Sequence, residues 1–232
     1  MINELLLVFS LLFLYSALLL FFKLFKQQGV CLWIICATII ANNEVMLLVH
    51  AFGVDMTLGN VLFASTFLAT DIISELYGKK EAERAVLYGV CAELVFFAVS
   101  YSWRFYIPLS NGCASKFQAV FANTPRILLA SLAVYLIAQL FDVWCYHKLW
   151  AYTTKLCKNS RRFLWLRNNV ATLLSQLINS VLFTLCAFYG IYEGSVLNSI
   201  IMSTFAIYFV TSLADTPFLY LARKIHEKGS DR

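Results

Sequence analysis

Two pairs of polar side chains lie one helical turn apart inside otherwise apolar stretches of the sequence. Asp71 and Glu75 are spaced i,i+4, and Gln139 and Asp142 are spaced i,i+3. Residues at these spacings share one face of a helix. A carboxylate accepts hydrogen bonds from N–H groups, and it can also hold a cation or a proton. The chemistry that these pairs offer is therefore the binding of a small polar molecule or of a proton.

A third polar stripe follows further along the chain. Ser175, Gln176, Asn179 and Ser180 recur at helical spacing. Serine and asparagine stripes also hold membrane helices together, and we favour that role for Ser175 and Ser180. The six residues that we expect to bind substrate are Asp71, Glu75, Gln139, Asp142, Gln176 and Asn179. For Glu75, capping of its helix end with a pair to Lys79 is an equal alternative.

The remaining ionisable groups in apolar segments are Glu44, Glu93, Arg126 and Asp215. An ionisable side chain near the centre of a bilayer costs about 2.5–3.5 kcal/mol, so it needs a partner or a wet cavity. We leave open whether these four carry a proton or are structural; Arg126 has the position of an interfacial anchor.

The elements that carry these residues must cross a membrane. Of the 232 residues, 61% are hydrophobic and only 13% are charged, about half the charged share that is usual in a soluble domain. Because a spanning segment must satisfy its own backbone hydrogen bonds, we predict an all-α integral membrane protein. The apolar stretches, each near the ~20 residues that a bilayer requires, are 5–22, 30–52, 58–77, 85–106, 126–147, 170–192 and 196–222.

We divide the chain into an extra N-terminal transmembrane helix with its first loop (1–29), a core of six transmembrane helices (30–222) and a basic cytoplasmic tail (223–232). The long connection between the fourth and fifth segments has room for a short interfacial helix. Measured from the cytoplasmic ends, Asp71, Glu93, Asp142, Asp215 and Gln176 lie about 8–12 Å deep. Five helices thus bring polar groups to one depth, which indicates the wall of a cavity; Glu44 is expected to lie deeper.

The basic residues predict the orientation. Fifteen of the 18 lysines and arginines fall on one side if alternate connections share a side, and basic residues near helix ends stay cytoplasmic. We therefore expect the N-terminus outside and the C-terminus inside. We therefore attribute the net charge of +5 to basic residues at the membrane surface and not to binding of nucleic acid. The fifteen are Lys23, Lys26, Lys79, Lys80, Arg84, Lys148, Lys155, Lys158, Arg161, Arg162, Arg167, Arg223, Lys224, Lys228 and Arg232.

Several classes of chemistry lack their sequence motifs. There is no GxxxxGK[ST] for a nucleotide, no HExxH for a zinc protease and no GxSxG for a serine hydrolase. The seven cysteines form no CxxC pair, and the three histidines are too dispersed for a metal cage. We expect no cofactor, no metal and no enzymatic activity, and a small-molecule transporter best explains acids inside the membrane.

Four motifs carry a family resemblance: TDIISELYGKK at residues 70–80, RILLASLAVYLIAQLFDV at 126–143, LRNNVATLLSQLINSVLF at 166–183 and TPFLY at 216–220. Together they resemble the bacterial queuosine precursor transporter family, which is sometimes grouped with vitamin uptake transporters. The resemblance implies import of a 7-deazaguanine base, such as preQ0, preQ1 or queuine, through the cytoplasmic (inner) membrane for salvage into tRNA modification. In this reading the acids contact the purine edge or carry a proton.

The chain departs from the family pattern at three places. Asn179 stands where the family usually has aspartate, Glu83 separates Ala82 from Arg84 where the family has an Ala-Arg pair, and no lysine precedes the last proline by about ten residues. If the family's aspartate and lysine form a buried pair, the loss of both residues in this chain leaves no unpaired buried charge. These differences bear on the exact substrate more than on the class.

Two other functions remain as alternatives. The chain could be a substrate-binding subunit that needs a separate ATP-driven module, since Ala37 and Ala41 have the small-residue spacing that helices use for docking. It could also be an intramembrane enzyme, for which we find no nucleophile or metal site. The expected partners are the small-molecule substrate and the lipid bilayer, with a homo-oligomer or an energising module left open.

Overall fold

The computed structural model describes residues 2–45, 47–107 and 125–230. The connection at 108–124, where a short interfacial helix was predicted, lies outside them. The described helices are α1 (Ile2–Glu44), α2 (Gly59–Tyr77), α3 (Lys79–Ser102), the 3₁₀ turn η1 (Trp103–Phe105), α5 (Pro125–Cys157), α6 (Leu164–Phe188) and α7 (Gly194–Ser230). Five of these segments are long and apolar enough to cross a membrane. The all-α membrane fold is therefore confirmed.

Helix α1 contains the first two predicted segments, and the chain reverses between them. Lys26 has a non-helical backbone with φ 54°, and the ring of Phe21 packs against that of Trp33 at 5.6 Å. At the opposite end, Asn3 donates to the carbonyl of His50 at 2.9 Å. The close approach requires Gly29, because a Cβ there would lie 2.2 Å from the Phe21 carbonyl oxygen.

The prediction that the second segment stays helical to Phe52 is wrong. The helix ends at Glu44 and is followed by an antiparallel hairpin of β1 (Leu48–Ala51) and β2 (Val54–Thr57). Phe52 and Gly53 form its turn with φ 54° and 76°, which is the positive-φ combination of a tight type I′ turn. Leu7 of α1 packs against the underside of this hairpin.

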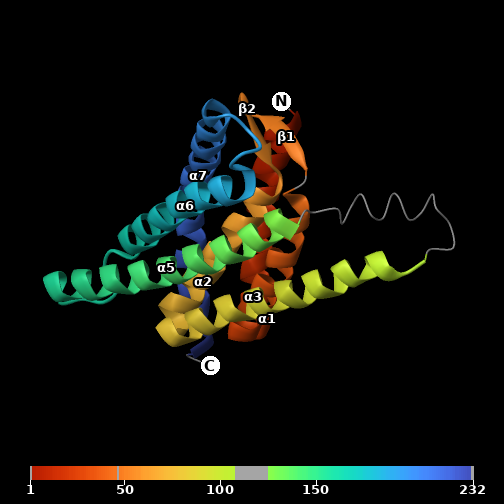
Figure 1. Cartoon of the computed structure of the whole chain (residues 1–232). Helices are drawn as coiled ribbons and strands as arrows, with labels where there is room; N and C mark the ends of the chain where they lie inside the picture. Colours follow the sequence, from red (N-terminus) through yellow and green to blue (C-terminus); the bar gives the residue numbers. More distant parts are fainter. Residues whose placement is uncertain (1, 46, 108–124, 231–232) are drawn as a thin grey trace.

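Helix α2 is the central helix of the bundle. It is buried along almost its whole length, because α1, α3, α5 and α7 all pack against it. Seven polar residues of α2 are therefore shielded from lipid by its neighbours: Asn60, Ser65, Thr66, Thr70, Asp71, Ser74 and Glu75. Figure 1 shows α2 behind α5, with the hairpin and the N-terminus at one end of the molecule and the C-terminus at the other.

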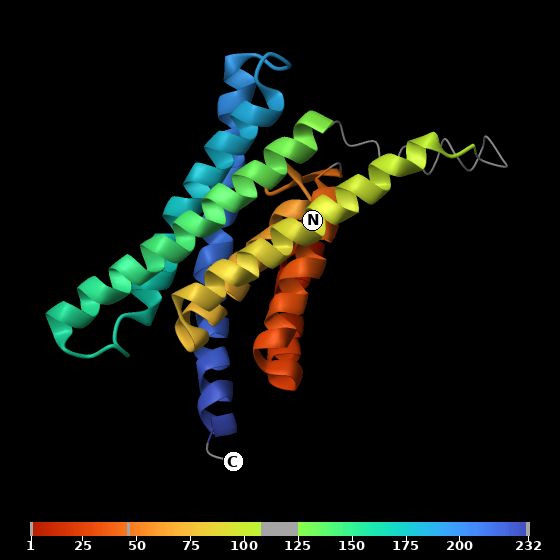
Figure 2. The ribbon, with the colours of Figure 1, turned by 60° about the horizontal axis from the view of Figure 1, so that its bottom comes forward.

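Helices α5 and α6 form an antiparallel pair, and α7 runs along the length of the bundle beside α6 (Figures 1 and 2). Helix α6 begins at Leu164 and not at Val170 as predicted. Arg167, which the charge count placed in a solvated loop, is therefore a helical residue, and its side chain is fully buried. Helix α7 continues past Ala222 to Ser230.

The basic segments gather at the end of the molecule opposite the hairpin. Gln27 donates to Glu81 at 2.8 Å across two of them, and Arg161 lies 3.6 Å from Glu227 across two others. His226, near the end of α7, stacks on Phe22. We call this region the basic end and the opposite region the hairpin end.

Candidate functional site

Three buried carboxyl groups from three helices meet inside the bundle. Asp71 of α2, Asp142 of α5 and Asp215 of α7 are each 1% exposed or less. The carboxyls of Asp71 and Asp142 lie within hydrogen-bonding reach of each other, and Asp215 is close enough to interact with both. We call these three residues the acid cluster. The common depth predicted from the sequence thus corresponds to real proximity for these three.

Helix α6 supplies a hydrogen-bond donor to each member of the acid cluster. The donors recur at helical spacing along its inner face, which is why one helix can serve acids from three others. The three bonds run from Thr172 Oγ1 to Asp71 Oδ2 (3.1 Å), from Ser175 Oγ to Asp142 Oδ1 (2.8 Å) and from Asn168 Nδ2 to Asp215 Oδ1 (2.6 Å). Each acid is thereby held in place by α6.

Some oxygens of the acid cluster have no donor among the described residues. They are Oδ1 of Asp71 and Oδ2 of Asp142, and Oε1 of Gln176 nearby on α6 is likewise without one. Buried polar atoms are normally hydrogen-bonded, so such acceptors need an explanation. A bound molecule with N–H groups, or a proton shared by the two carboxyls, would satisfy them. Among the described residues, no group of three His, Cys, Asp or Glu could hold a metal ion.

Gln139 was predicted to bind substrate, but its side chain is already occupied. Its Oε1 accepts from Thr70 at 2.9 Å and its Nε2 donates to Thr66 at 2.8 Å. Both threonines belong to α2, and Gln139 is fully buried. In this structure Gln139 therefore ties α5 to α2.

Glu75 does not pair with Lys79, which instead lies 3.5 Å from Glu83. Nη2 of Arg167 reaches both carboxylate oxygens of Glu75, at 2.7 and 2.6 Å, and the Tyr146 hydroxyl donates to the same carboxylate at 2.7 Å. The alternative role for Glu75, a pair with Lys79 at the helix end, is thus wrong. Glu75 lies in a fully bonded cluster near the basic end.

Aromatic rings and backbone carbonyls complete the environment of Arg167. Its guanidinium lies 4.4 Å from the centre of the Trp150 ring, a cation–π distance. Its Nη1 donates to the carbonyls of Ser160 and Arg162 at 3.2 and 3.1 Å. Arg167 therefore joins α2, α5, α6 and the α5–α6 connection.

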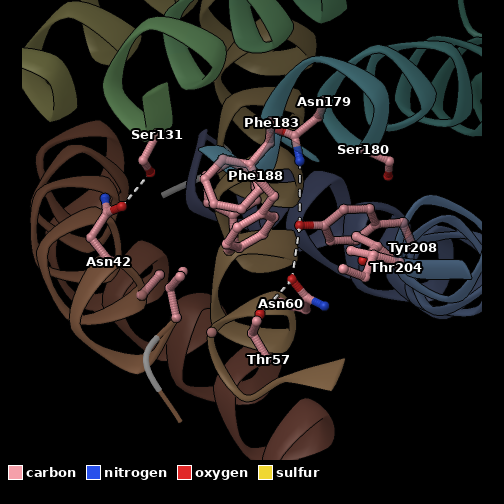
Figure 3. A pocket seen from close by; sticks show the side chains of 15 residues that line it. Asn42, Thr57, Asn60, Ser131, Asn179, Ser180, Phe183, Phe188, Thr204 and Tyr208 are labelled. Carbon is pink, nitrogen blue, oxygen red and sulfur yellow. Dashed lines mark hydrogen bonds between the residues drawn. The ribbon is translucent and has the colours of Figure 1, made fainter. Parts of the chain in front are cut away.

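Asn179 lies away from the acid cluster, in a pocket at the hairpin end (Figure 3). Its Nδ2 donates to the hydroxyl of Tyr208 at 3.4 Å, and that hydroxyl donates to Asn60 Oδ1 at 3.3 Å. On the far side of the same pocket, Ser131 donates to Asn42. The six predicted residues are thus not in one place. Asp71 and Asp142 belong to the acid cluster with Gln176 nearby, Glu75 to the Arg167 environment, Asn179 to this pocket and Gln139 to the α2–α5 contact.

The other ionisable candidates lie apart from these sites. Glu44 is the last residue of α1, beside the hairpin and far from the basic end. Glu93 is buried between α3 and α5, against Leu128 and Leu132. Arg126 donates to the carbonyls of Cys186 and Tyr189 at 2.9 and 2.7 Å, which ties the start of α5 to the end of α6.

Sequence reasoning missed Arg167, Asn60 and Tyr208. Arg167 stands in the third motif, next to Asn168, so the motif itself was the available signal. Asn60 and Tyr208 stand 148 residues apart in the sequence, so spacing along one helix does not reveal their contact. Only the fold brings them to Asn179.

Comparisons with known proteins identify the family. Residues 57–222 match the family described as "Putative vitamin uptake transporter". The "Probable queuosine precursor transporter" of Bacillus subtilis (strain 168) is 37% identical over 208 residues, which cover 89% of this chain and 89% of that protein. No solved structure matches the chain. This chain therefore belongs to the queuosine precursor transporter family of vitamin uptake transporters, and it is a multi-pass membrane transport protein and not an enzyme.

Proposed function

We propose that this protein imports a queuosine precursor, a 7-deazaguanine base, across the bacterial cytoplasmic membrane. The relative from Bacillus subtilis is named as a probable transporter of the same cargo. The observation that carries the proposal is a continuous row of buried polar side chains on α6, from Asn168 through Thr172 and Ser175 to Asn179. The ends of this row are eleven residues apart, which is about 17 Å along a helix, so the row follows much of the way through the bilayer core.

The acid cluster fits the edge of such a base. A guanine-like edge presents N–H donors in one plane, and a carboxylate accepts two of them. Oδ1 of Asp71 and Oδ2 of Asp142 have no other donor in the described chain. Two adjacent carboxyls repel when both are ionised, so we propose that they share a proton when the site is empty.

The proposed transport path is open at one end and closed at the other. The pocket that contains Asn179 opens the row of polar residues toward the hairpin end. The Glu75–Arg167 pair closes it toward the basic end. With the basic end in the cytoplasm, the N-terminus and the hairpin are outside and the C-terminus is inside. The structure then represents a state that receives cargo from outside.

An ATP-driven module remains an alternative source of energy, but its predicted docking stripe is occupied. Ala37 and Ala41 are each 2% exposed. A Cβ at Gly59 of α2 would lie 2.5 Å from the Ala41 carbonyl oxygen, so these small residues serve the close packing of α1 on α2. A module would have to bind another surface of the chain.

Uptake by the purified chain in liposomes tests the proposal. Labelled preQ0 and preQ1 would be added outside, with and without an imposed proton gradient, and protein-free liposomes would be the control. We expect accumulation without ATP. Binding without uptake would favour the substrate-binding subunit, and neither binding nor uptake of either base would refute the proposed cargo.

A further inference from the structure

The pocket at the hairpin end is chemically different from the acid cluster. It has a volume of about 570 Å³ including its open mouth, and it lies between α1, α2, α5, α6 and α7. None of the residues that line it carries a charge. Its polar groups are amides and hydroxyls, which suit an uncharged ligand. The acid cluster, by contrast, places three carboxyls together.

A chain of hydrogen bonds orients one amide of this pocket. Asn60 Oδ1 accepts from both Thr57 Oγ1 at 3.0 Å and the Tyr208 hydroxyl at 3.3 Å, and Asn179 donates to Tyr208 in turn. Because the oxygen of Asn60 is used twice, its Nδ2 is turned away from both donors, as Figure 3 shows. Asn60 is 7% exposed, and its Nδ2 has no acceptor in the described chain.

A buried donor without an acceptor is costly, and natural proteins rarely leave one without a reason. An ordered water is the ordinary explanation. Here, however, Asn60 is one of the residues that line a pocket, and its amide is held in one orientation by two neighbouring side chains. The position is therefore prepared for an acceptor such as a ring carbonyl oxygen.

Aromatic rings stand beside the oriented amide. Phe183 and Phe188 pack edge to face at 5.8 Å on one side, and Phe63 lies 6.4 Å from the Tyr208 ring on another. In Figure 3 the rings of Phe183 and Phe188 lie above and to the left of Asn60, and its nitrogen points to the right, toward the side of Thr204 and Tyr208. Such rings offer apolar surfaces against which a flat molecule can pack.

We infer that this pocket is a second binding site, which takes the planar, uncharged ring of its ligand through a hydrogen bond from Asn60 Nδ2 to the ring carbonyl oxygen. The inference rests on the proposed function, since the ligand is the transported base before it reaches the acid cluster. Asn179 links the two places because it lies one helical turn from Ser175 on α6. In this inference the cargo first binds the amides of the pocket at the hairpin end and then the carboxyls of the acid cluster.

Equilibrium binding to the full chain in nanodiscs tests this site. The probes are preQ0 and its 6-thio analogue, which keeps the N1–H group that the acid cluster would bind but replaces the carbonyl oxygen by a weaker acceptor. Wild type should bind the analogue about tenfold more weakly, which is the size of one lost hydrogen bond in a desolvated site. Asn60→Leu should bind preQ0 about tenfold more weakly than wild type does and should no longer distinguish the two probes.

Two further variants keep the test decisive. Tyr208→Phe retains the ring but removes the hydroxyl that orients Asn60, so it should lose part of the discrimination even if Asn60→Leu fails to fold. Asn43→Leu is the matched control, because Asn43 donates to the Ile39 carbonyl at 2.7 Å and does not line the pocket. It should bind both probes like wild type.

The outcomes separate this inference from the proposed function. If wild type binds preQ0 and the folded Asn60 and Tyr208 variants retain both affinity and discrimination, the donor serves a water and the inference is overturned. If wild type itself binds neither probe, the proposed cargo is wrong. Loss of discrimination with intact folding supports the second site.

Discussion

Arg167 of α6 and Glu75 of α2 form a buried ion pair in which a single nitrogen, Nη2, contacts both carboxylate oxygens at 2.7 and 2.6 Å. Their side chains are 0% and 5% exposed. Arg223 approaches the same carboxylate at 3.7 Å. Three helices are thus held together at the basic end by one acid, and the pair separates the acid cluster from that end.

Breaking this ion pair from one side should destabilise the protein. Arg167→Met leaves Glu75 buried without its main partner, and such a loss typically costs about 3–5 kcal/mol. Because Arg223 remains nearby, the lower part of that range is expected. The double variant Glu75→Gln/Arg167→Met removes both charges and should recover part of the loss. Chemical unfolding in detergent micelles measures each free energy of unfolding.

The exposed pair of Lys79 and Glu83 provides the control. Their side chains are 45% and 41% exposed at 3.5 Å, and such surface pairs contribute about 0–1 kcal/mol. Lys79→Met should therefore change the free energy of unfolding little. If Arg167→Met lowered the free energy of unfolding no more than Lys79→Met does, the Glu75–Arg167 pair would not stabilise the fold.

The sequence predicted the apolar helices well because the thickness of the bilayer sets the length of each hydrophobic segment. It failed at the hairpin, since Leu48–Ala51 has the same residue types as the helix before it and only the Phe52–Gly53 turn distinguishes them. It misplaced Arg167 because a charge count treats an arginine near a helix end as solvated. The partner that permits its burial, Glu75, is 92 residues away.

The candidate site was predictable in part for a similar reason. Asp71 and Asp142 stood out because a carboxylate in an apolar helix needs an explanation. Gln139 stood out equally, but its partners Thr66 and Thr70 are neutral and look unremarkable in the sequence. Whether a polar side chain is occupied or open depends on contacts between helices, which spacing along one helix does not reveal.

The reversal inside α1 depends on Gly29. A Cβ at this position would lie 2.2 Å from the Phe21 carbonyl oxygen and 3.0 Å from Cβ of Phe25. Backbone atoms cannot move aside, so Gly29→Leu should greatly reduce the yield of monodisperse protein in size-exclusion chromatography. Gly194→Leu is the control, because nothing lies within 4 Å of a Cβ there. Equal yields from both variants would contradict a close approach at Gly29.

The proposed orientation predicts which residues a membrane-impermeant thiol reagent reaches. In a variant without native cysteines, Leu48→Cys at the exposed hairpin should be labelled on intact cells. Lys158→Cys at the α5–α6 connection should be labelled only after the membrane is opened, because that connection belongs to the basic end. Labelling of Lys158→Cys on intact cells would reverse the orientation.

Asp71 is the residue whose change should separate transport from folding most clearly. Asp71→Asn keeps the shape, and its remaining oxygen can still accept from Thr172. It places an amide donor where Oδ1 now stands without a partner. This donor would face the N–H groups of the base, and a buried mismatch costs about 1–3 kcal/mol, which is roughly a five- to 150-fold loss in binding. Uptake should fall at least in proportion.

The control for Asp71→Asn is the same substitution at Asp55, whose side chain is 81% exposed on the hairpin. Uptake, binding and the melting temperature would be measured in one preparation of each variant. We expect Asp55→Asn to transport normally and Asp71→Asn to melt close to wild type while losing uptake. If Asp71 only ties α2 to α6 through Thr172, its variant keeps that bond and will retain normal uptake per folded molecule. That result would remove Asp71 from the binding site and leave Asp142 as the acid to test next, because its Oδ2 is the other open acceptor of the cluster.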